Sequence, residues 1–165
     1  MDLADLGASQ LVGMIERGEI TSVELIEACI ARIDALEDTI GAWAHLDREF
    51  ARRQAAERDA YRASGAPLGP LHGIPVGIKD IFDTEDLPTE NGTVLSKGRL
   101  PDEDCTAVRR LKAAGAVIMG KTVTTELAVY SPGKTRNPHD PNRTPGGSSS
   151  GSAAAVAAGM VPLAI

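Results

Sequence analysis

The segment from Thr144 to Gly159 constrains this chain most, because it joins a loop rich in serine and glycine directly to a helix of small apolar residues. The loop carries three adjacent hydroxyl groups, on Ser148, Ser149 and Ser150. Glycine leaves the backbone there free to adopt conformations that other residues rarely take. The following run of alanine, valine and glycine has no polar face, so we expect this helix to be buried. A hydroxyl-bearing loop held by a buried helix is typical of a catalytic loop.

Composition and charge narrow the class of protein. The chain has 165 residues, of which 42% are hydrophobic and 24% charged, and this predicts a single globular domain. The formal net charge of −6 disfavours nucleic acid and anionic membranes as partners, because both attract basic patches. No apolar run reaches membrane-spanning length, and the N-terminus lacks the features of a secretory signal. We therefore expect a cytoplasmic protein that binds neither nucleic acid nor membranes.

The cysteines and the glycine motifs indicate neither a metal site nor a cofactor site. Cys29 and Cys105 stand alone and far apart, so we expect free thiols in a reducing compartment. No Cys/His spacing suggests a metal centre. The phosphate-binding motif GxxxxGK[ST] and the dinucleotide motif GxGxxG are both absent.

Residues 1–63 predict an N-terminal helical arm. Thr21 and Glu24 form the two ends of a capping box, in which each side chain caps the start of the helix. The apolar positions that follow keep helical spacing. The next segment is charged and rich in alanine, which predicts an exposed helix. The predicted helices span residues 9–18, 21–36 and 47–63.

Residues 64–165 predict the start of an α/β core. A loop rich in proline and glycine is followed by an apolar strand, a helix closed by Gly115, and a second buried strand. Strand, helix and strand in this order form a βαβ unit, which implies a parallel sheet covered by helices. The predicted strands span residues 74–80, 116–120 and 161–165, and the predicted helices span residues 105–114, 124–130 and 152–159.

Lys79 lies at the carboxyl end of the first of these strands, where open parallel sheets bind their ligands. A lysine followed by a carboxylate, here Asp80, is most often a charged structural residue. The alternative is a buried lysine, because burial disfavours the ammonium form and allows the amine to act as a base near neutral pH. The apolar run before Lys79 makes such burial plausible.

The serines also have a structural interpretation, because a serine at a helix start often serves as an N-cap. Ser150 or Ser152 fits that role, yet three serines in a row exceed what capping needs. No G-x-S-x-G motif supports a hydrolase nucleophile elbow. The three histidines show no local signature of a triad, and we expect them on the surface or in loops. They are His45, His72 and His139.

Three motifs together resemble the amidase signature family, and the resemblance extends over nearly the whole chain. They are Gly73-Ile-Pro-Val-Gly-Ile-Lys-Asp80, Gly115-Ala-Val-Ile-Met-Gly-Lys-Thr122 and Pro145-Gly-Gly-Ser-Ser-Ser-Gly-Ser-Ala-Ala-Ala-Val-Ala157. The resemblance implies an α/β fold with a mixed, largely parallel sheet covered by helices. It also implies cleavage of amide bonds by a Ser–cis-Ser–Lys triad without a cofactor or metal.

Carried over by motif, the resemblance implies that Lys79 is the catalytic lysine and Ser148 the cis-serine. Gly146, Gly147, Ser149 and Ser150 would then be supporting loop residues. The nucleophile serine belongs to a block of the form G-T-D-T-G-G-S, which does not occur in residues 1–165. We therefore expect an incomplete amidase domain, inactive on its own and prone to self-association through an exposed sheet edge.

The resemblance leaves three functions open. The first is the N-terminal part of a free-standing amidase that acts on a small-molecule amide. The second is the A-type component of a glutamine-dependent tRNA amidotransferase, which shares the three motifs. The segment from Lys121 to Tyr130 departs from the N-M-D-E-F run associated with that component, and this favours the first function. The third is a non-catalytic fragment that acts only by binding.

Overall fold

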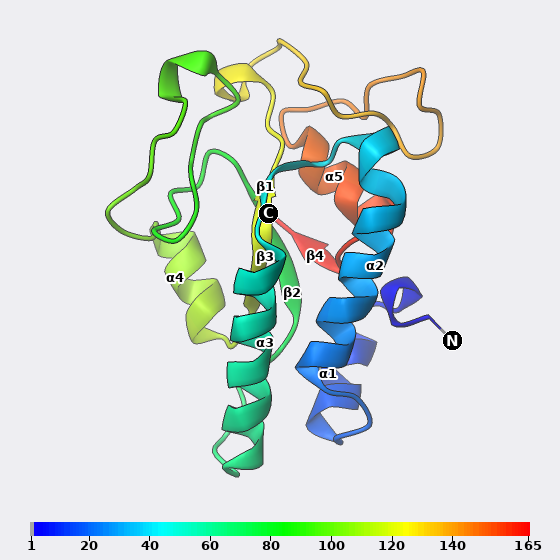
Figure 1. Cartoon of the computed structure of the whole chain (residues 1–165), viewed down its shortest axis with the longest axis vertical. Helices are drawn as coiled ribbons and strands as arrows, with labels where there is room; N and C mark the ends of the chain where they lie inside the picture. Colours follow the sequence, from blue (N-terminus) through cyan, green and yellow to red (C-terminus); the bar gives the residue numbers. More distant parts are fainter. Residues whose placement is uncertain (1) are drawn as a thin grey trace.

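A computed structural model describes residues 2–165 and shows a four-stranded mixed sheet with helices on both faces (Figure 1). The α-helices are α1 (Ala8–Glu16), α2 (Ser22–Ile40), α3 (Arg48–Ala63), α4 (Thr106–Ala113) and α5 (Ser150–Ala157). The strands are β1 (Trp43–Leu46), β2 (Pro75–Lys79), β3 (Val117–Thr122) and β4 (Leu163–Ala164). Short 3-10 turns are η1 (Leu3–Asp5), η2 (Val94–Ser96) and η3 (Glu126–Ala128).

The sheet has the strand order β1-β3-β2-β4. Strand β2 runs parallel to both β3 and β4, which confirms the βαβ unit and the largely parallel sheet. Strand β1 pairs antiparallel with β3 and was not predicted from the sequence. This strand comes from the predicted helical arm, so the arm contributes directly to the sheet. The division of the chain at residues 63 and 64 remains a prediction.

Two apolar clusters lie on the two faces of the sheet. Figure 1 shows α4 on one side of the sheet and α1, α2 and α5 on the other. Val117 and Met119 of β3 belong to the cluster with α1, α2 and α5. Ile118, between them, belongs to the cluster with α4, together with Ile78 of β2. This alternation is what a strand buried on both faces requires.

The predicted helix boundaries are largely confirmed. The capping box is present, with Thr21 accepting from the backbone of Glu24 and the Glu24 carboxylate accepting from the backbone of Thr21. Helix α2 continues past the predicted end to Ile40, and Gly41 ends it in a left-handed conformation. Helix α3 packs beside β3, where the Gln54 side chain bonds both the N–H and the C=O of Ile118. This pairing satisfies backbone groups of β3 that β1 is too short to reach.

Two predictions about helices were wrong in part. The segment 124–130 forms only the turn η3, and Leu127 and Ala128 have positive φ values of 48° and 58°, which an α-helix does not permit. Helix α5 is not buried all round: Ala154 and Ala155 face the core, whereas Val156 is 42% exposed. In the part of the chain that the structure describes, no helix is long and apolar enough to cross a membrane.

Candidate active site

Lys79 and Ser148 lie side by side, although they are 69 positions apart in the sequence. Lys79 ends β2, where its backbone N–H donates to Ile165 O at 2.9 Å. Its side chain crosses to the serine loop, and Nζ lies 2.5 Å from Ser148 Oγ. The sequence expectation that these two residues meet at the carboxyl end of the sheet is therefore met by the geometry.

Burial sets the chemistry of the lysine. The Lys79 side chain is only 6% exposed, and this burial lowers the pKa of its amine from the ordinary value of 10.5. Ser148 is half-buried. A neutral amine within hydrogen-bond distance of a hydroxyl can accept that hydroxyl's proton, so the pair has the arrangement of a base and a proton donor.

The loop before α5 is held by backbone contacts with the end of β3. The peptide bond between Gly147 and Ser148 is cis, as the resemblance implies for the middle serine of the triad. Thr125 N donates to Ser148 O at 3.0 Å, and Gly151 N donates to Val123 O at 2.9 Å. A Cβ at Gly151 would lie 2.3 Å from Val123 N, so only glycine allows this close approach.

A cavity of about 520 Å³ opens beside Ser148. One wall carries the apolar side chains of Ala128, Val129 and Pro132. The other residues that line it are Thr125, Tyr130, Thr144, Gly146, Gly147 and Ser148. The predicted loop residues Gly146 and Gly147 therefore lie against the cavity together with the serine hydroxyl.

The other serines of the loop differ from the expected N-cap roles. Ser149 takes the N-cap position, is exposed, and forms no capping bond through its side chain. Ser150 is the first helical residue, and its buried hydroxyl donates to Val123 O. Ser152 lies inside α5, where its hydroxyl donates to Ile165 O at 2.8 Å and lies 2.7 Å from Thr122 Oγ1. Both buried serines thus bond the strand ends instead of capping the helix.

The sequence analysis missed several polar residues around the site. Thr122 and Thr125 flank the end of β3 and bind the α5 segment, but isolated threonines carry no local signature. Lys121 and Asp80 form a buried ion pair of 3.2 Å behind β2. Their adjacency to two of the quoted motifs was the one available signal.

The histidines lie in three different environments. His72 is only 3% exposed, which corrects the expectation of a surface or loop position, and its Nε2 lies 2.9 Å from Arg58 O. His45 Nε2 lies 3.0 Å from a carboxylate oxygen of Glu90. Cys29 and Cys105 are free thiols. Among residues 2–165, no group of three or more His, Cys, Asp or Glu side chains is placed to hold a metal ion.

Known proteins share much of this sequence. A relative from Salinispora arenicola, described as the A-type component of glutamyl-tRNA(Gln) amidotransferase, is 46% identical over 99% of this chain and 35% of its own length. A relative of the same description from Streptomyces coelicolor is 45% identical over 99% of this chain and 34% of its own length. The chain thus spans about a third of the length of these relatives.

Solved structures share the fold. Native peptide amidase from Stenotrophomonas maltophilia matches with a TM-score of 0.90 and 38% identity, over 97% of this chain and 35% of that chain. Fatty acid amide hydrolase matches with a TM-score of 0.90 and 31% identity, over 98% of this chain and 30% of that chain. The sequence model of the amidase family matches residues 24–165. With this match, the shared fold and the three motifs, the chain belongs to the amidase family, the amidase signature enzymes.

Proposed function

We propose that this chain supplies Lys79 and Ser148 to a Ser–cis-Ser–Lys triad that hydrolyses the C–N bond of a small-molecule amide. The observation that carries the proposal is the distance of 2.5 Å between Lys79 Nζ and Ser148 Oγ, with the lysine buried. A buried amine is the form that accepts protons, and a hydroxyl can accept one proton while it donates another.

In this mechanism, a nucleophilic serine attacks the amide carbonyl carbon and passes its proton to Ser148. Ser148 passes its own proton to Lys79 at the same time. The C–N bond then breaks as the proton returns through Ser148 to the leaving nitrogen, which leaves an acyl-serine that water hydrolyses. The family motif assigns the nucleophile to a G-T-D-T-G-G-S block, which is not among residues 1–165.

The cavity beside Ser148 supports a small amide as substrate. Its apolar wall suits an aliphatic or aromatic substituent, and the hydroxyls of Thr125 and Thr144 can hydrogen-bond a polar one. The loop glycines Gly146 and Gly147 leave their backbone open to the cavity. The supporting roles of these glycines, and of Ser149 and Ser150, remain part of the proposal.

A second candidate is the role of the A-type component in a tRNA-dependent amidotransferase. The relatives from Salinispora arenicola and Streptomyces coelicolor, at 46% and 45% identity, both carry that description and favour it. The sequence from Lys121 to Tyr130 favours the free-standing amidase instead. Both candidates break the same kind of bond, so Lys79 and Ser148 would have the same roles in each. A cytoplasmic location, which the two free thiols favour, belongs to both.

Ammonia release tests the proposal and separates the candidates. The protein that carries residues 1–165, at whatever length it is encoded, is assayed with simple primary amides and with glutamine, in the presence and absence of added partner proteins. A free-standing amidase releases ammonia without partners, whereas an amidotransferase component requires them. We expect no release from residues 1–165 alone, because the nucleophile is not among them. Release by these residues alone would contradict the triad as assigned.

A further inference from the structure

The residue after Lys79 is buried together with a second lysine, on the face of the sheet opposite Ser148. Register explains the placement: Val76 pairs with Ile118, but Gly77 pairs with Gly120. Met119 is therefore the extra residue of a β-bulge, and a bulge reverses the alternation of side chains beyond it. Lys121 pairs with Ile78 and faces α4, whereas without the bulge it would face α5.

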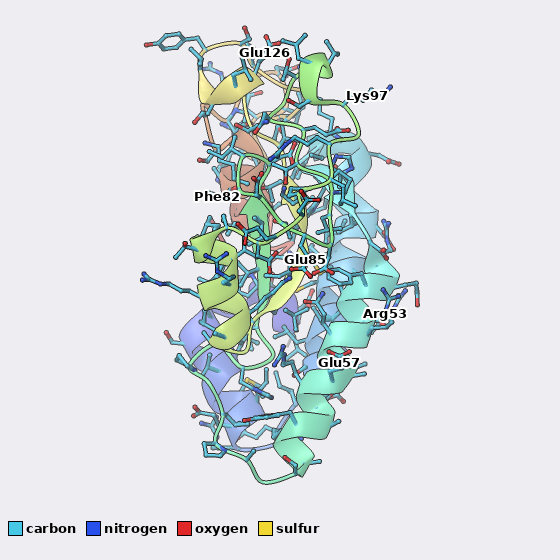
Figure 2. All side chains as sticks on the ribbon, turned by 90° about the vertical axis from the view of Figure 1, so that its left-hand side faces the viewer. Arg53, Glu57, Phe82, Glu85, Lys97 and Glu126 are labelled. Carbon is cyan, nitrogen blue, oxygen red and sulfur yellow. The ribbon has the colours of Figure 1, made fainter. Side chains whose placement is uncertain are left out.

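Lys121 binds the segment that follows β2. Its side chain is fully buried, and Nζ donates to Phe82 O at 3.0 Å and to Pro88 O at 3.1 Å. It also donates to Thr89 Oγ1 at 2.5 Å. Figure 2 faces this side of the molecule and labels Phe82 in the segment between β2 and α4. Because all these contacts are to protein atoms, Lys121 is placed to hold this segment and not to meet a substrate.

Asp80 is the fourth partner of Lys121, and it joins three segments at the end of β2. Its carboxylate lies 3.2 Å from Lys121 Nζ and accepts from the backbone N–H of Glu90. Its own N–H donates to Thr122 O at 2.9 Å, and its carbonyl accepts from Asn91 N at 3.0 Å. The residue directly after Lys79 is thus fixed through both its backbone and its side chain.

The pair depends on both charges. Burial alone would raise the pKa of Asp80 and lower the pKa of Lys121, and their mutual attraction opposes both shifts. Removing one partner would leave an uncompensated buried charge, which a fold tolerates poorly. The other ionisable groups that act on the pair are His45, Asp83 and Cys105. Glu90, which holds Asp80 through its backbone, directs its carboxylate to His45.

We propose that Asp80 and Lys121 are positioning residues for Lys79, which clamp the carboxyl end of β2 from the face opposite Ser148 and so hold the Lys79 amine against the serine. This inference rests on the role proposed above for Lys79. The clamp explains why two charges are buried beside an apolar cluster that could have accommodated a purely apolar pair. It also gives the β-bulge a purpose, since the bulge turns Lys121 toward the segment after Lys79.

The test compares Lys121→Met with two other variants. Lys112→Met is the matched control, because it breaks a lysine pair with Asp104 (2.6 Å) and Asp86 (2.7 Å) in the same connecting segment but away from β2. Thr89→Val is the mild variant, because it removes one contact to Lys121 and keeps the shape of the side chain. It keeps the test decisive if Lys121→Met does not fold.

Two measurements are made on each folded variant. Amide hydrogen exchange compares the backbone of Lys79 and Asp80 with that of α2, and competitive acetylation gives the titration midpoint of the Lys79 amine. In Lys121→Met we expect exchange at Lys79 and Asp80 to accelerate more than exchange in α2. We also expect the Lys79 midpoint to rise by about 0.5 pH unit or more, because the amine loses burial. Thr89→Val should give a smaller change in the same direction.

The proposal is overturned if Lys121→Met, or Thr89→Val where Lys121→Met does not fold, matches Lys112→Met in both measurements. Neither measurement needs turnover, so the clamp can be tested apart from the proposed reaction. A protein that shows the local changes but hydrolyses no amide keeps the clamp and loses the proposed function. An active protein in which Lys121→Met keeps the wild-type kcat and the wild-type Lys79 midpoint loses the clamp and keeps the function.

Discussion

Replacing Gly151 by alanine should destabilise the protein, although alanine is the better helix former. In the folded chain, Val123 N donates to Ala42 O at 2.9 Å, which joins the end of β3 to the start of β1. A Cβ at position 151 would lie 2.3 Å from both of these atoms, where ordinary contacts are 3.4–4 Å. Both atoms are backbone, so neither can move without displacing a strand end.

The magnitude follows from opposing effects. Overpacking a well-packed site costs about 1–3 kcal/mol, and disrupting a buried hydrogen bond costs about 1–3 kcal/mol. The gain in helix propensity offsets about 1 kcal/mol. We therefore expect Gly151→Ala to lower the free energy of unfolding by about 2–4 kcal/mol.

Gly13 in α1 provides a control of opposite sign. A Cβ there would meet only the flexible end of Arg17, at 3.0 Å. Gly13→Ala should therefore raise the free energy of unfolding by about 0.5–1 kcal/mol. Urea unfolding followed by the fluorescence of Trp43, the only tryptophan and a buried one, measures both variants. A Gly151→Ala variant as stable as the wild type would refute the close approach of α5 to β3.

Three further predictions concern the site and its edges. Because burial lowers the pKa of Lys79, the wild type should gain stability relative to Lys79→Met as pH rises from that lowered pKa toward 10.5, as urea titrations at several pH values would show. Ser152→Ala should cost about 1–3 kcal/mol by leaving buried partners unpaired, whereas Ser149→Ala, at an exposed position, should change stability by about 0.5 kcal/mol or less in the same assay. Residues 1–165 should self-associate in light scattering, because β4 pairs only with β2 and Val156 is exposed; a monodisperse monomer would contradict this.

The sequence predicted the elements whose signals are local. The capping box fixed the start of α2, and apolar runs bounded by glycine and proline located β2 and β3. Strand β1 was missed because Trp43–Leu46 is only four residues long and mixes apolar and polar side chains. Its pairing with β3 is a tertiary effect that no local pattern reports. The exposed face of α5 was missed for a related reason, since composition alone does not say which face is covered.

The site was predictable only in part. Lys79 and Ser148 were paired through their motifs, because nothing in their spacing brings them together. The ion pair of Asp80 and Lys121 depends on the β-bulge at Met119, which reverses the alternation that a sequence pattern assumes. The hydroxyl contacts of Ser152 with Thr122 likewise arise only when α5 packs on the strand ends.

The central claim is that Lys79 and Ser148 act as one proton relay, and a double-mutant cycle on amide hydrolysis tests it most directly. The protein that carries this chain is assayed as wild type, Lys79→Met, Ser148→Ala and the double variant. Each single substitution should lower kcat by about 10²-fold or more, because general acid–base transfer contributes that much. Residues that act as a unit are non-additive, so the double variant should be no slower than the slower single variant. Losses that multiply in the double variant, or a single variant that keeps the wild-type kcat, would contradict the relay.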